Sequence, residues 1–115
     1  MEETELTLVE AHLFALAKKI VKIVCDEFGL TCKKLTVFHP EDPDKINTKG
    51  MCDDNGVITL SLRKGVKGKF YELDDFIDTV IHEIAHLKYM SHNKDFYNLL
   101  RRMKRWFKKH YINPK

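Results

Sequence analysis

Residues 80–87 read V-I-H-E-I-A-H-L, and the H-E-x-x-H pattern within them constrains the fold more than any other part of the chain. His82 and His86 are four residues apart, which on an α-helix is about 40° around the axis and about 6 Å along it. Both imidazoles then project from one face and can bind the same ion. The apolar neighbours are typical of a helix buried in a core. The pattern therefore predicts a buried helix that presents two histidines to a metal site.

A third histidine, His92, adds a condition on the path of the chain. Ten residues of continuous helix would carry it about 15 Å beyond His82, out of reach of a shared ion. We therefore expect the helix to end before His92, in a segment where Ser91 and Asn93 favour turns and caps. Three imidazoles leave a fourth coordination position open, as in catalytic zinc sites. We predict a Zn²⁺ ion bound by His82, His86 and His92.

Glu83 lies next to the first of these histidines. A carboxylate beside the metal is placed to take a proton from water whose pKa the cation lowers to about 7. Glu83 is therefore the candidate catalytic residue, a general base for hydrolysis. A non-catalytic zinc-binding module would have no need of such a carboxylate. A helix with surface histidines and a salt-bridging glutamate remains the simplest alternative, and hydrolysis of a nucleotide phosphate lacks a glycine-rich phosphate loop.

Length and composition are those of one globular domain covering residues 1–115, with 43% hydrophobic and 32% charged residues. No apolar run reaches the roughly 18 residues of a membrane-spanning helix, and the acidic start lacks the basic region of a secretory signal. We expect a cytoplasmic protein that does not enter membranes. Cys25, Cys32 and Cys52 are odd in number and lack C-x-x-C spacing, which argues against disulfides and against a thiolate zinc site.

Hydrophobic periodicity predicts an α+β fold of three helices and a small sheet. The first helix should run from a capping box at Thr7 and Glu10 to Gly29, and residues 34–38 should form a strand. Two further strands, 50–54 and 57–62, should flank a two-residue Asn55-Gly56 turn with positive φ at both positions. Their inward row should be Ile58, Leu60 and Leu62, with Thr59 and Ser61 outward. We expect Asp74 or Asp75 to cap the motif helix and Asn93 to cap the last helix.

These elements resemble the YgjP-like and WLM metallopeptidase families, which are related to the SprT type. The resemblance covers roughly residues 49–97 and is strongest in H-E-I-A-H, the third histidine ten residues after the first, and the phenylalanine at 96. It implies a minimal zincin-like fold, in which a small antiparallel or mixed sheet packs on three helices and the motif helix lines the cleft. It also implies a zinc metalloendopeptidase acting on peptides or unfolded proteins, with Phe96 as a packing aromatic. A metzincin is disfavoured because Tyr89 stands where that class has a glycine.

The last helix is rich in positive charge. Between residues 94 and 115 there are eight Lys or Arg and one Asp. We predict an outer face made of Arg101, Arg102, Lys104, Arg105, Lys108 and Lys109, with Trp106 and Phe107 between them. A solvated face with aromatics in the core competes with a nucleic-acid surface. WLM-type and SprT-type relatives are associated with proteolysis of proteins crosslinked to DNA, which keeps nucleic acid as a candidate partner.

Four further residues are candidates for supporting roles. Tyr97, Tyr71 and His39 are candidates for stabilising the oxyanion, and none is preferred. Asp78 precedes His82 by one helical turn and is a candidate for orienting an imidazole. The hairpin is the expected sheet edge for holding an extended peptide above the cleft.

Overall fold

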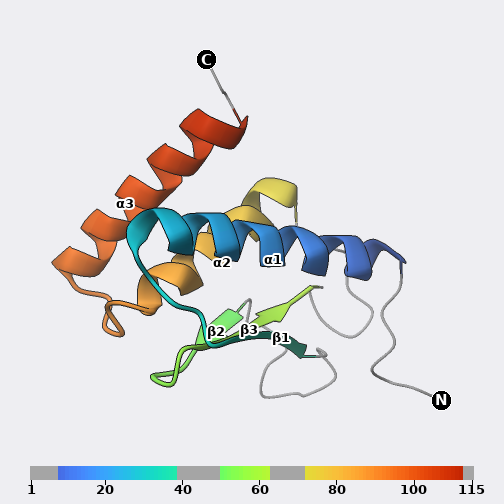
Figure 1. The fold of residues 1–115 in the computed structure, drawn as a ribbon, viewed down its shortest axis with the longest axis horizontal. Helices are drawn as coiled ribbons and strands as arrows, with labels where there is room; N and C mark the ends of the chain where they lie inside the picture. The colour runs from blue at the N-terminus through green and yellow to red at the C-terminus, as the bar shows by residue number, and fades with distance from the viewer. Residues whose placement is uncertain (1–7, 39–49, 63–71, 113–115) are drawn as a thin grey trace.

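The computed structural model describes residues 8–38, 50–62 and 72–112. They form helices α1 (Leu8–Phe28), α2 (Leu73–His86) and α3 (Lys94–Phe107), the last continued by a π-helical segment η2 (Lys108–Ile112). The strands are β1 (Lys34–Phe38), β2 (Gly50–Cys52) and β3 (Val57–Ser61). Figure 1 shows the strands gathered on one side of α1 and α2, with α3 leading away at an angle. The α+β class is confirmed.

The three strands form a mixed sheet with β3 in the centre, in the order β1-β3-β2. β1 runs parallel to β3, from Lys34 opposite Val57 to Phe38 opposite Ser61. β2 runs antiparallel to β3, as expected for a hairpin. Within the described residues β1 and β2 are therefore the two sheet edges, and β2 is the edge that packs against α2.

Four residues, 53–56, connect β2 to β3, rather than the predicted two-residue turn. Gly56 has φ +84°, but no non-glycine residue among those described has positive φ, so the prediction for Asn55 is wrong. Instead the Asp53 carboxylate accepts hydrogen bonds from the N–H groups of Asn55 and Val57, at 2.9 and 3.1 Å. Gly56 N–H bonds to the Asp53 carbonyl at 3.1 Å. An Asp at the first position thus selects a turn followed by one left-handed glycine.

α2 is the central element of the core, because it packs against α1, α3, β2 and β3. Eight of its fourteen residues are buried, which is typical of a helix that packs against several neighbours. The inward row of β3 is confirmed. Ser61 alternates onto the opposite face, as predicted, but it is buried there rather than exposed. The largest fully buried apolar side chains come from all three helices and from β3: Ile20, Val24, Ile58, Leu60, Phe76, Val80, Ile81, Ile84, Phe96 and Met103.

The helix ends agree only in part with expectation. α1 ends at Phe28, and the next residue, Gly29, has φ +69°. The Leu30 N–H bonds to the Cys25 carbonyl at 2.9 Å, as in a Schellman motif. Asn93 caps α3, as predicted. The N-cap of α2 is Glu72, which makes no side-chain capping bond, so neither Asp74 nor Asp75 is the cap; both lie in the first turn. The predicted box at Thr7 lies outside the described residues.

Candidate metal centre

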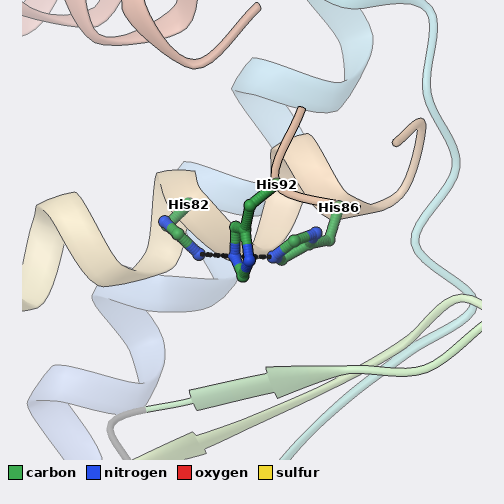
Figure 2. A group of neighbouring side chains, drawn as sticks. All are labelled: His82, His86 and His92. Atoms are coloured by element: carbon green, nitrogen blue, oxygen red, sulfur yellow. Dashed lines mark hydrogen bonds between the residues drawn. The ribbon is translucent and has the colours of Figure 1, made fainter. Parts of the chain in front are cut away.

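The structure brings His82, His86 and His92 together (Figure 2). His92 Nε2 lies 3.3 Å from His82 Nε2 and 3.0 Å from His86 Nε2. One ring nitrogen from each residue lies within 4.8 Å of the other two. The three imidazoles therefore point at a common centre, although they come from two helical turns of α2 and from the segment that follows it.

A sharp turn after α2 returns His92 to the helix, as the spacing predicted. The last helical carbonyls are used within the turn: Leu87 N–H bonds to Ile84 O at 3.0 Å, and Tyr89 N–H bonds to Ala85 O at 3.1 Å. Asn93 then begins α3 by accepting a hydrogen bond from Phe96 N–H at 2.9 Å. His92 therefore stands immediately before a capped helix, where its backbone direction is set by the start of α3.

Phe96 lies under the three histidines and is fully buried. Its ring centroid is 5.0 Å from that of His82, 4.4 Å from that of His86 and 5.1 Å from that of His92. The His86 ring stacks on it with an interplanar angle of 23°. The packing role expected for Phe96 is therefore confirmed, and this contact restricts the ring orientations of all three histidines.

The tautomer of His86 follows from a hydrogen bond that the sequence did not reveal. His86 Nδ1 is 2.9 Å from the Tyr89 carbonyl, which only accepts, so Nδ1 carries the proton. Burial lowers the pKa of His86, the Tyr89 carbonyl opposes this, and the charge of His92 adds to the lowering. The ring is held neutral with its Nε2 lone pair directed at the centre, which is the form that binds metal.

The donor set fits a tetrahedral zinc ion. Two nitrogens at about 2.0–2.1 Å from such an ion lie about 3.3–3.4 Å apart. The observed separations of 3.3 and 3.0 Å are close to this value. One His92 Nε2–H could satisfy only one of the two facing nitrogens, so mutual hydrogen bonding does not account for the cluster. Burial, and then the charges of His86, His92 and Lys104, lowers the pKa of His82 to about 4, which keeps that ring neutral.

Glu83 is buried beside the histidines, with 6% of its surface exposed. It faces the first residue of β2: a Cβ built on Gly50 would lie 3.2 Å from Glu83 Cγ and 3.3 Å from Glu83 Oε2. Burial raises the pKa of Glu83 to about 7. The carboxylate thus has a proton affinity suited to transfer near neutral pH. A glycine within a strand often marks such a close approach, and this was the available signal for Gly50.

A pocket of about 340 Å³ extends from the centre along α2 and is lined by Gly50, Asp78, His82, Glu83 and Lys104, among others. Asp78 also lines this pocket, but among the described residues it makes no hydrogen bond to His82. The imidazole that a hydrogen bond does orient is that of His86, through the Tyr89 carbonyl. Lys104 is half-buried and lines the pocket, so its predicted place on the outer face of α3 is wrong. Basic residues are frequent along α3, so the sequence offered no pattern that distinguishes Lys104 from the others.

The other sequence candidates are only partly placed. Tyr97 stacks on His92 with centroids 6.1 Å apart and is 44% exposed. Tyr71 and His39 lie outside the described residues. Cys52 lies on β2 near Glu83, and burial, followed by the Glu83 charge, raises the pKa of its thiol to about 12. A protonated thiol is a poor metal ligand, which agrees with a centre made of histidines alone.

The class of fold is α+β, with a candidate metal centre formed by two histidines of its central helix and a third histidine that the next turn brings back. The chain belongs to the WLM domain family, which matches residues 7–113. The resemblance seen in the sequence is thereby confirmed. WLM proteins of this kind are metalloproteases, so membership supports a protease.

Solved structures of Wss1 share the fold. A Wss1 mutant from Saccharomyces cerevisiae is 22% identical with a TM-score of 0.76, over 96% of this chain and 88% of that chain. Wss1 from Saccharomyces cerevisiae is 25% identical with a TM-score of 0.70, over 85% and 77% of the two chains. Wss1 from S. pombe is 23% identical with a TM-score of 0.67, over 83% and 77%. Among curated proteins, none matches the chain. No described helix combines the length and apolar character needed to cross a membrane.

Proposed function

We propose that this chain is a zinc-dependent metalloendopeptidase domain, spanning residues 1–115. His82, His86 and His92 are the proposed zinc ligands, and Glu83 is the proposed general base. The observation that carries the proposal is the convergence of three imidazole nitrogens beside a buried carboxylate. A structural zinc site would use four protein ligands and would not place an ionisable carboxylate beside them.

Zinc bound at these ligands would supply Lewis acidity, polarising a scissile amide carbonyl and lowering the pKa of water to about 7. Glu83 accepts the proton of the attacking water and returns it to the leaving amine. Its raised pKa supports both steps, because a group near 7 both gains and loses a proton readily at neutral pH. Hydrolysis then needs no covalent intermediate on the protein.

The substrate is proposed to be a peptide in extended form. Among the described strands β2 is a sheet edge, and its first residue, Gly50, lines the same pocket as His82 and Glu83. Main-chain groups on such an edge bind an extended peptide as an added strand, without requiring a particular side chain. Unfolded proteins present this conformation, so they are the expected substrate class.

The test compares the wild type with Glu83→Gln, measuring zinc stoichiometry and the cleavage of casein. We expect the variant to keep its zinc and to lose at least about 100-fold in rate, as for removal of a general base. Glu72→Gln is the matched control, since Glu72 is exposed at the start of the same helix and makes no capping bond. Zinc binding without activity in the wild type would instead support a non-catalytic zinc-binding module. Full activity in Glu83→Gln would reject the proposed base.

Proteolysis of proteins crosslinked to DNA is a second candidate function. The supporting observation is that Arg101, Arg102, Arg105, Lys108 and Lys109 are all exposed on α3 and η2. The aromatics among them pack inward, since Phe107 is buried and Trp106 contacts Phe28 edge-on at 6.0 Å. Stimulation of casein cleavage by single-stranded DNA would favour this function, and a DNA-independent rate would count against it.

A further inference from the structure

A second groove, of about 460 Å³, lies between α1 and β1. It shares no lining residue with the pocket that contains His82 and Glu83. Its floor is apolar: Val21 and Cys25 are buried, and Leu30 and Leu35 are half-buried. Apolar surface left open beside a helix is typical of a place where another chain packs.

The rim of this groove is positively charged. Lys18, Lys22, Lys33 and Lys34 line it and are exposed. The one acidic residue in the lining, Asp26, is 3.3 Å from Lys22 and offsets that lysine alone. The groove therefore carries a net charge complementary to an acidic ligand.

β1 forms one wall of the groove, and some of its main-chain groups point outward, away from β3. The N–H of Lys34 is directed at the Gly56 carbonyl, 3.4 Å away on the β3 side. Because the backbone alternates along a strand, the N–H and C=O groups of Leu35 and Val37 point away from β3. No described residue pairs with that side of β1. A helix beside a sheet edge, across an apolar floor, is the arrangement by which proteins add an extended peptide to a sheet.

We propose that the groove between α1 and β1 is a docking site for an extended acidic segment of a partner protein, which pairs with the outer edge of β1. An aliphatic side chain of the segment packs on Val21 and Leu35, and flanking Asp or Glu residues face the lysines. Nucleic acid is disfavoured as the occupant, because the lining contains no aromatic side chain on which a base would stack.

The groove adjoins the far end of the candidate active site. Thr31 lines both the groove and a smaller pocket of about 280 Å³ that includes His86. A partner docked along β1 would therefore reach the edge of a pocket that His86 also lines. Docking itself requires neither zinc nor Glu83, so the proposal stands independently of the proposed peptidase activity.

The test uses Glu83→Gln protein, so that cleavage does not remove the probe, and a fluorescein-labelled peptide Glu-Asp-Val-Val-Val-Asp-Glu. Fluorescence anisotropy should show binding of this peptide, and none of a peptide with Lys at the acidic positions. Lys33→Glu should weaken binding about fivefold, since one exposed charge pair contributes up to about 1 kcal/mol. Lys19→Glu is the matched control, because Lys19 is exposed on α1 outside the groove, and it should bind as well as Glu83→Gln alone.

A second measurement locates the bound peptide on the unmodified groove. Amide chemical-shift changes on titration should concentrate on residues 18–26 and 33–37. Val37→Pro should reduce binding while the protein still unfolds cooperatively, because proline is tolerated on the open side of an edge strand. Shift changes confined to α3, an equal loss in Lys19→Glu and Lys33→Glu, or displacement of the peptide by a single-stranded oligonucleotide would each overturn the proposal.

Discussion

α2 and α3 are helices of equal length, 14 residues each, that bury different kinds of side chain. The five buried residues of α3 are all apolar, and its charges lie mostly in solvent. α2 buries apolar residues together with Glu83 and His86, which are only 6% and 8% exposed. Burying an ionisable group costs free energy unless it is well paired. α2 thus buries two ionisable side chains that stability alone does not favour, whereas α3 buries no ionisable side chain.

This contrast predicts different effects for substitutions in the two helices. Changing a buried polar residue of α2 should remove zinc or activity, because these residues converge on one centre. Changing a buried residue of α3 should reduce stability, because it contributes packing. Changing an exposed residue of α3 should affect neither, unless that face binds a partner.

The largest expected effect is that of His86→Ala. It removes a proposed ligand and its bond to the Tyr89 carbonyl. Zinc should be lost, and activity should fall by more than the roughly 100-fold that follows loss of an outer-shell partner. Atomic absorption and casein cleavage measure the two effects. His12→Ala is the control, since His12 is exposed on α1 and bonds to Leu8 O; an equal loss there would break the contrast.

Met103→Ala tests the opposite helix. Met103 is fully buried on α3, and removing its side chain should lower the free energy of unfolding by about 2–5 kcal/mol. Urea denaturation gives this value, and folded protein should still bind one zinc per chain. Arg101→Ala, an exposed change two residues earlier, is the stability control. Loss of zinc with little loss of stability would contradict the view that the buried residues of α3 contribute packing and not metal binding.

Sequence patterns predicted the centre well where helical geometry or reach imposed it. The spacing of His82 and His86 fixes their common face, and the distance to His92 requires a turn that Ser91 and Asn93 permit. The alternation of Ile58, Leu60 and Leu62 likewise predicted the buried row of β3. These inferences use only short-range periodicity, which backbone geometry determines.

What the sequence missed depends on contacts between distant segments. Nothing local indicates that β1 pairs in parallel with β3. A glycine within a strand signals a close approach, but it does not indicate that the partner of Gly50 is Glu83. The inward place of Lys104 depends on the angle at which α3 crosses α2, and the role of Tyr89 depends on a carbonyl, which every residue has. The hairpin loop differed because the Asp53 carboxylate competes for the same turn N–H groups.

Gly50→Ala sharpens the α2 side of the comparison. The new Cβ would press on Glu83 Cγ and Oε2 and on Leu60 Cδ2, 3.3 Å away, so the carboxylate or the strand must shift. We expect about a tenfold loss in kcat with zinc retained, because small misplacement of a catalytic group is costly. In a Glu83→Gln background the same change should have little further effect on activity. Equal losses in both backgrounds would mean that Gly50 does not act through Glu83.

Asn93→Ala acts where the two helices meet. The Asn93 side chain accepts a hydrogen bond from Phe96 N–H at 2.9 Å. Its loss should cost about 1 kcal/mol in the free energy of unfolding. Because His92 precedes the cap, zinc affinity should also fall slightly. Asn93→Asp should restore most of the stability, since Asp caps about as well, and failure of this rescue would show that the cap is not the cause.

The smallest stability change is expected for Arg101→Gln combined with Arg105→Gln, on the exposed face of α3. The free energy of unfolding should change by less than about 0.5 kcal/mol, because both side chains are in solvent. If this face contacts single-stranded DNA, the slope of log affinity against log salt should become shallower by about 1.4, or about 0.7 for each lost phosphate contact. Lys19→Gln with Lys88→Gln, which removes two exposed charges elsewhere, controls for net charge. An identical slope change in the two double variants would mean that DNA responds to the overall charge of the protein. In that case α3, unlike α2, would contain no binding site.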